Sequence, residues 1–178
     1  MSAIHSHTEF MDAPATLNIQ TCGPEAAEDI HALTQEAYAP YASLTPPSDA
    51  LDETLQVVRS ELRSVGGFIA TVDGVPVAAG RFGGEDLVDT EDAHSLEVER
   101  LCVRPDQQGL GIGTAVMEWV HEHAAEHGYR EVRLGVRTDL PRNRSFYRRL
   151  GYVESRLHHQ PNGTNWWEMH RQIAAHTL

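Results

Sequence analysis

Apolar and polar residues follow two different periods along this chain, and the change from one period to the other marks its elements. In residues 16–22 (TLNIQTC) they alternate, as in a strand with one buried face, and Gly23 and Pro24 end the run. In residues 24–41 apolar side chains return at helical spacing behind an acidic first turn. The pattern therefore predicts a strand followed by a helix.

The rest of the chain can be divided in the same way. The predicted elements are a strand at 16–22, helices at 24–41 and 48–64, two strands within 66–84, a strand at 96–105, a helix at 114–127, a strand at 130–138, a helix at 141–151, and strands at 152–159 and 165–173. Asp73 and Gly74 suit a tight hairpin turn between the two strands within 66–84. This order predicts an α/β fold around a largely antiparallel sheet with parallel pairing near its middle.

Length and composition are those of one ordinary globular domain. The 178 residues include 40% hydrophobic and 22% charged residues. Residues 1–16 show no period and are predicted to form a flexible arm, whereas residues 17–178 are predicted to form a single domain. The sequence has no apolar run of about 18 residues and no leader-like start, so we expect a cytoplasmic protein without a membrane segment.

The net charge of the chain favours some classes of binding partner over others. The formal net charge is −12, and all 14 basic residues are Arg. An acidic surface repels phosphate backbones, which makes nucleic acid a poor partner and cationic small molecules or basic peptides better ones. Cys22 and Cys102 are too few for a disulfide framework or for a zinc site built from thiolates.

The most informative motif is QGLGIG at residues 108–113, between a predicted strand and a predicted helix. Glycine lacks a Cβ, so successive backbone N–H groups can turn toward one centre, and the helix dipole adds positive potential there. We therefore expect the amides from Gly109 to Thr114 to bind a pyrophosphate. A tight turn or close helix packing is the alternative use of these glycines.

Two other nucleotide-binding motifs do not fit this segment. A P-loop requires Lys after its last glycine, and the chain contains no Lys. The dinucleotide fingerprint requires G-x-G-x-x-G, whereas Gly109, Gly111 and Gly113 give G-x-G-x-G. The segment excludes a nucleotide triphosphatase and argues against a nicotinamide enzyme.

The segment LCVRPDQQGLGIGTAVM resembles the acyl-CoA-binding motif of the GNAT superfamily of N-acetyltransferases, a strand followed by Gln/Arg-x-x-Gly-x-Gly/Ala and a helix. Gln108, Gly111 and Gly113 take the three defined positions, and NRSFYRRLGY resembles the second family motif. The resemblance implies a GNAT-like sheet of about seven strands, with helices on both faces and a splayed central strand pair. It also implies acetyl-CoA as co-substrate and an amine acceptor.

By this resemblance the pantetheine arm pairs with the strand before the loop, and the pyrophosphate lies on the loop. The residues implied to bind the coenzyme are Leu101, Cys102, Val103, Gln108, Gly109, Leu110, Gly111, Ile112, Gly113, Thr114 and Asn143. Asn143 departs from the family pattern, because it precedes Tyr147 by one helical turn instead of two, and Leu140 takes the earlier place. Contact with the arm, bracing of the splayed strands and capping of the short helix all remain open for Asn143.

The resemblance also assigns the acid and the base. Tyr147 is the implied general acid, because a hydroxyl with an ordinary pKa of about 10 is protonated at neutral pH and can donate to the departing thiolate. The ammonium of the acceptor must lose a proton before it attacks. Glu97 and Glu99 share one face of a strand from which family members often take an acid, and Glu97 is preferred to Glu99. Simple pairing with Arg100 or Arg133 is the alternative.

Three further features of the sequence concern metal binding and the acceptor. His123 and His127 share a predicted helix face, but the rest of a metalloprotease motif is absent, and no metal is expected. The acidic segment 85–92 has two interpretations, recruitment of a cationic acceptor and a solvated loop. In the family the final hairpin often borders the acceptor pocket, and its candidates here are His158, His159, Trp166 and Trp167.

The sequence thus predicts an N-acetyltransferase that moves an acetyl group from acetyl-CoA to a primary amine of an unidentified small molecule or peptide, by direct attack in a ternary complex. One alternative is a non-catalytic acyl-CoA sensor with the same fold. Another is an acyltransferase with a different acyl donor or an oxygen acceptor. The two Trp of the final strand are compatible with a homodimer.

Overall fold

The computed structural model describes residues 16–83 and 94–174. The predicted arm, apart from Thr16, and the acidic segment 85–92 therefore lie outside the described residues. None of the helices in the described part is long and apolar enough to cross a membrane.

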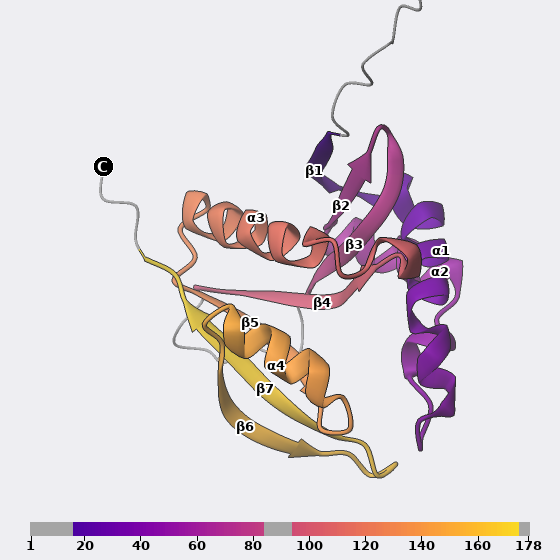
Figure 1. Cartoon of the computed structure of the whole chain (residues 1–178), viewed down its shortest axis with the longest axis vertical. Coiled ribbons are helices and arrows are strands. Elements are labelled where there is room, and N and C mark those ends of the chain that lie inside the picture. Colours follow the sequence, from indigo (N-terminus) through magenta and orange to yellow (C-terminus); the bar gives the residue numbers. More distant parts are fainter. Residues whose placement is uncertain (1–15, 84–93, 175–178) are drawn as a thin grey trace, which may run out of the picture.

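Seven strands form one mixed sheet in the order β1-β2-β3-β4-β5-β7-β6 (Figure 1). Every neighbouring pair in this order is antiparallel except β4 and β5, which are parallel. The strands are β1 (Leu17–Cys22), β2 (Gly67–Val72), β3 (Val75–Gly83), β4 (Ser95–Val103), β5 (Glu131–Arg137), β6 (Val153–His159) and β7 (Asn165–Gln172). The predicted sheet, with its parallel pair in the middle, is confirmed.

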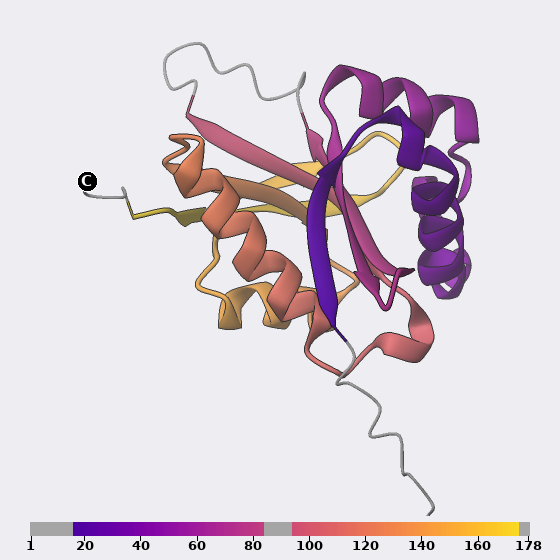
Figure 2. The ribbon, with the colours of Figure 1, turned by 90° about the horizontal axis from the view of Figure 1, so that it is seen from above.

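Helices cover both faces of the sheet, and each face has its own core. The helices are α1 (Ala27–Tyr38), α2 (Leu55–Ser64), α3 (Ile112–Glu126) and α4 (Pro141–Arg149). Val116 and Val120 of α3 belong to the larger buried cluster, against which the side chains of α4 also pack. Ile30 of α1 and Leu62 of α2 belong to a second cluster on the opposite face. Figure 2 shows α3 and the α1–α2 pair on opposite sides of the strands.

The first two helices are shorter than predicted. The α-helix within 24–41 runs only from Ala27 to Tyr38, with 3-10 turns on either side, η1 (Pro24–Ala26) and η2 (Ala39–Ser43). The helix predicted from residue 48 begins at Leu55, because Thr54 caps it by accepting a hydrogen bond from the Val57 amide at 3.3 Å. Residues 49–51 form a separate turn, η3 (Asp49–Leu51).

Gly80 of β3 lies where the sheet meets the larger core. A Cβ at this position would lie 2.3 Å from Cζ of Phe68, a fully buried side chain on β2. Backbone atoms of β3 and a packed aromatic ring cannot both move away without loss of contacts. Gly80 is therefore required by the packing of Phe68.

We predict that Gly80→Ala destabilises the protein by about 1 to 3 kcal/mol, because the added methyl group overpacks the core. The free energy of unfolding in urea measures the change. Gly23→Ala is the matched control, because the atoms nearest to its Cβ would belong to the exposed Glu25 side chain, which can move. Equal stabilities of the two variants would contradict the packing argument.

Candidate active site

The two central strands pair briefly and then separate. Residues 95–97 of β4 lie beside residues 131–133 of β5. Beyond them β4 stays bonded to β3 as far as Val103, and β5 stays bonded to β7 as far as Arg137. Figure 1 shows β4 running away from the β5–β7–β6 part of the sheet. We call the region between residues 98–103 of β4 and 134–137 of β5 the splay; it is the separation that the family resemblance implied.

A β-bulge bends β4 inside the splay. Between the pairs Arg81–Glu99 and Ala79–Cys102, β4 contains one residue more than β3. Arg100 lies at this point with φ of 51°, a left-handed conformation that is uncommon for a residue with a Cβ. A bulge increases the local twist of its strand, which directs β4 away from β5.

The glycines after β4 lie in two different settings. Gly109 (φ 77°) and Gly111 (φ 83°) adopt the left-handed conformation, and a Cβ on either would meet nothing within 4 Å. Gly113 has an ordinary conformation, but its Cβ would lie 3.4 Å from Cζ of Phe146 on α4. The first two glycines therefore shape the turn that opens α3, whereas the third lies beside Phe146 of α4 at ordinary contact distance.

Helix α3 begins at Ile112, two residues before the predicted start, and Gly111 is its N-cap. The first N–H groups of a helix have no acceptor within the helix, so they are available to a ligand. Gln108 does not point away from this turn, because its Nε2 donates to the carbonyl of Val103 at 3.0 Å. Leu110 is 68% exposed at the tip of the turn, whereas Ile112 is buried beneath it.

The residues of β4 expected to meet the coenzyme arm point in alternate directions. Leu101 and Val103 pack against the core under α3, whereas Cys102 is buried in the core under α1. The Leu101 carbonyl accepts a hydrogen bond from Tyr38 Oη at 3.5 Å. Burial raises the pKa of the Cys102 thiol to about 11, so it is not a thiolate at neutral pH.

Helix α4 brings Tyr147 and Asn143 to the splay. Burial raises the pKa of Tyr147, and neighbouring Tyr152 and Tyr41 act in the same direction. The phenol is therefore protonated at neutral pH. Asn143 donates from Nδ2 to Tyr41 Oη at 3.5 Å, which links α4 to η2 on the other side of the splay. The N-cap of α4 is Leu140, so Asn143 does not cap this helix; contact with the coenzyme arm and bracing of the splayed strands stay predictions.

Glu97 and Glu99 lie on the face of β4 away from buried Leu96 and Val98, before the bulge begins. The carboxylate of Glu97 lies over Gly83, whose Cβ would be 2.8 Å from Glu97 Oε2. Glu99 is exposed. Both carboxylates therefore lie on the α1–α2 side of the splay, on the side opposite α3.

A buried polar chain that the sequence did not reveal supports Tyr147 from behind. Arg171 donates from Nη1 to His121 Nδ1 at 2.7 Å, so His121 carries its proton on Nε2 and donates it to Tyr152 Oη at 2.9 Å. The ring of Tyr152 packs edge-on against Tyr147, with centroids 5.6 Å apart. Burial and the charge of Arg171 lower the pKa of His121 to about 4.

The final hairpin adds a second group on the α1–α2 side. His158 stacks on Trp166 at a centroid distance of 3.9 Å and contacts Glu168 Oε2 at 3.1 Å. Burial opposes the ionisation of Glu168, but hydrogen bonds from Ser155 and His158 lower its pKa overall. Trp166 and Glu168 are two residues apart on β7, so their side chains share one face of the sheet.

A cavity of about 360 Å³ lies away from the splay, at the C-terminal end of α3. His123 and His127 line it, with ring centroids 4.0 Å apart, as their predicted shared face requires. Within the described ranges no three His, Cys, Asp or Glu side chains are arranged to hold a metal ion. The splay is the better candidate site, because the glycine turn, Tyr147 and the two glutamates surround it.

Comparison with known proteins identifies the family. Residues 28–152 match the sequence model of the Acetyltransferase (GNAT) family, and this range includes the glycine turn, Tyr147 and both glutamates. The chain belongs to the GNAT family of acetyltransferases. GNAT members use acetyl-CoA, and the fold described above is that of the family.

Individual relatives agree with this membership. The chain is 33% identical over 92 residues to an uncharacterized N-acetyltransferase of Methanocaldococcus jannaschii, a match that covers 52% of this chain and 41% of that relative. The match therefore spans less than half of the relative's length.

Solved structures of GNAT proteins share the fold. The ribosomal-protein-S18-alanine N-acetyltransferase of Escherichia coli is 18% identical, with a TM-score of 0.71 over 92% of this chain and 99% of that chain. The yncA protein of Salmonella typhimurium, solved with its cofactor acetyl-CoA, is 17% identical, with a TM-score of 0.67 over 91% of this chain and 96% of that chain.

The lowered pKa of His121 has a measurable consequence. Between pH 6.5 and about 4 the unfolded chain binds more protons at this position than the folded chain, so acidification through this window favours unfolding. We predict that wild type loses about 1 to 2 kcal/mol more stability than His121→Gln between about pH 7 and pH 4.5. Urea unfolding at both pH values measures the difference, and parallel losses would contradict it.

Proposed function

We propose that this GNAT protein transfers the acetyl group of acetyl-CoA to a primary amine by direct attack in a ternary complex. The observation that carries the proposal is the glycine turn, which opens α3 next to the splay and packs against α4, the helix of Tyr147. The turn expected to bind the pyrophosphate and the residue expected to protonate the thiolate thus belong to neighbouring elements. The acceptor is a small molecule or a peptide.

The turn and the edge of β4 supply the groups for the coenzyme. The amides from Gly109 to Thr114 would hold the pyrophosphate, because free N–H groups and the dipole of α3 meet there. The exposed backbone edge at Leu101 and Val103 would take the pantetheine arm as an added strand. This edge faces the splay, where β4 has left β5.

Each protein group then has one task. A main-chain N–H of β4 polarises the thioester carbonyl. The amine nitrogen forms the new bond to the carbonyl carbon, and the carbon–sulfur bond breaks. Tyr147 Oη donates a proton to the departing sulfur, for which its protonated state is required. Cys102 takes no part as a nucleophile, since its thiol is buried under α1 and its pKa is raised.

The base would come from the α1–α2 side of the splay. Glu97 and Glu99 both face this side, so either can accept the proton of the ammonium directly or through a water molecule. Glu97 is the preferred candidate, because it lies at the point where β4 and β5 part, opposite Arg133 of β5.

Tyr147→Phe tests the proposal most directly. We expect its turnover to fall by about 100-fold or more, because the proton donor is lost, while its affinity for acetyl-CoA stays within about twofold of wild type. Thiol release over a panel of primary amines measures turnover, and calorimetry measures binding. Tyr129→Phe, a Tyr remote from the splay at the end of α3, is the control. Unchanged turnover would refute Tyr147 as the general acid, absence of turnover in wild type would indicate a sensor, and no heat with wild type would refute coenzyme binding.

Glu97→Gln and Glu99→Gln distinguish the two candidate bases. The variant that has lost the base should show kcat/KM for the amine reduced by about 100-fold, and the acidic limb of its pH profile should disappear. The other variant should keep that limb. If both variants retain the limb of wild type, neither glutamate is the base.

A further inference from the structure

The connection between α1 and α2 crosses the splay and is fastened on both sides of it. We call residues 46–53 the strap. It contains η3, and its Ala50 side chain is fully buried. Two hydrogen bonds tie the strap to α1: Gln35 Nε2 donates to the Ala50 carbonyl at 3.1 Å, and His31 Nε2 contacts the Glu53 carbonyl at 3.0 Å.

Arg137 fastens the first part of the strap to β5. Its Nη2 donates to the Pro46 carbonyl at 2.9 Å and its Nη1 to the Pro47 carbonyl at 3.3 Å. Asp139 orients the guanidinium by accepting from Nε at 3.0 Å and from Nη2 at 2.7 Å. The side chain of Arg137 is only 15% exposed. The planar fork of Arg makes all these contacts at once, which the single ammonium of Lys cannot do.

Arg100 fastens the last part of the strap to β4. Its Nε bonds Glu53 Oε1 at 2.8 Å, and its Nη1 lies 3.3 Å from Asp49 Oδ1. Glu53 is 11% exposed and also accepts from Arg81 Nη2 at 3.0 Å, so it joins two arginines. Charge-assisted hydrogen bonds in such a setting are strong and hold a fixed geometry.

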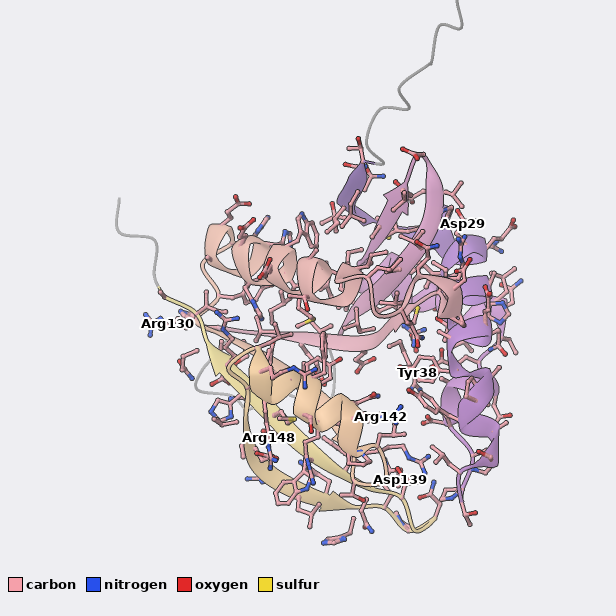
Figure 3. All side chains as sticks on the ribbon, in the orientation of Figure 1. Asp29, Tyr38, Arg130, Asp139, Arg142 and Arg148 are labelled. Carbon is pink, nitrogen blue, oxygen red and sulfur yellow. The ribbon has the colours of Figure 1, made fainter. Side chains whose placement is uncertain are left out.

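The two fastening points belong to the two walls of the splay. Arg100 is at the bulge of β4, and Arg137 is the last residue of β5, beyond the point where these strands part. Figure 3 shows Tyr38 of α1, Arg142 of α4 and Asp139, the partner of Arg137, around the gap between α1 and α4. The strap thus links the walls on the α1–α2 side, where they share no backbone pairing.

The strap lies on the side from which the acceptor amine must enter the splay. In the ternary complex proposed above, the coenzyme lies on the turn beside α3 and α4. The acceptor must enter the splay from another side, because two substrates cannot occupy one path. The α1–α2 side holds Glu97, Glu99 and the strap, so an amine that reaches the base passes next to the strap.

We propose that Arg137 and Arg100 are specificity-determining positioning residues: by tying the strap to both walls of the splay, they set how large an amine can reach the thioester. This inference rests on the proposed acetyl transfer. Neither arginine needs to touch the amine. Release of the Arg137 end frees residues 46–48 from β5 and widens the entrance, whereas the coenzyme turn, on the other face, is unaffected.

Hydrogen exchange tests the mechanical part of the proposal. The amides of Leu51 and Asp52 bond within the strap, to Ser48 O at 3.1 Å and Asp49 O at 3.0 Å. In Arg137→Gln the peptide 46–53 should exchange about tenfold faster than in wild type, with β2 and β3 unchanged. Arg137→Lys, which keeps the charge but not the fork, should lie between them. Arg63→Gln, an exposed Arg at the end of α2, is the control and should match wild type.

Competition between methylamine and benzylamine for acetyl-CoA tests the specificity part. In Arg137→Gln the ratio of kcat/KM for benzylamine to that for methylamine should rise about tenfold, while KM for acetyl-CoA stays within about twofold. Arg137→Lys should give a smaller rise, and Arg63→Gln none. Product masses give the ratio directly.

The outcomes distinguish failure of the strap proposal from failure of the proposed acetyl transfer. The proposal is overturned if the amides of the strap exchange at the same rate in Arg137→Gln as in wild type. Faster exchange with an unchanged amine ratio overturns it as well, including the case in which neither amine reacts. A larger KM for acetyl-CoA in place of an altered ratio also overturns it. Failure of the underlying acetyl transfer would instead show as absence of thiol release by wild type with every amine of the panel.

Discussion

Two neighbouring strands that stop pairing leave backbone N–H and C=O groups inside a sheet, and each of these groups needs another partner. β4 and β5 part after residues 97 and 133, and everything at the site follows from this. The protein itself satisfies part of the exposed edge, since Tyr38 donates to the Leu101 carbonyl and Gln108 to the Val103 carbonyl. An extended ligand that adds to the edge as a strand, as proposed for the pantetheine arm, would satisfy the groups between them.

The separation is maintained by charge as well as by backbone geometry. Arg100 adopts a left-handed conformation at the bulge, and such a conformation persists only where the surroundings determine it. Its ion pair with Glu53, which also binds buried Arg81, supplies that restraint. Removal of the Glu53 carboxylate would leave Arg100 and Arg81 without this ion-pair partner, and the Arg81 side chain is only 2% exposed. Loss of one partner of a buried ion pair is destabilising, so the three residues depend on one another.

Two kinds of feature could be predicted from the sequence: elements with a regular apolar period, and turns that depend on local backbone chemistry. Period-two and helical patterns located the strands and helices, and the glycine spacing located the turn before α3. The start of α2 was missed because Leu51 continues the helical pattern of Leu55, while Glu53 and Asp49 are held outside the helix by Arg100. Contacts between residues 47 and 137 or between 121 and 171 cannot be predicted from one sequence, since no local period relates their members.

The distribution of charge along the chain corrects the expectation that was based on its net charge. The net value of −12 suggested a cationic acceptor, but residues 129–178 contain nine of the 14 Arg and only four acidic residues. This segment forms β5, α4, β6 and β7, so the wall of the splay that includes β5 is rich in arginine. On the other wall, Asp49 and Glu53 of the strap are paired with Arg100 of β4. Potentials from charges at these distances act locally, because salt screens them beyond about 8 to 10 Å. The net charge of the chain is therefore not a guide to the potential at the splay.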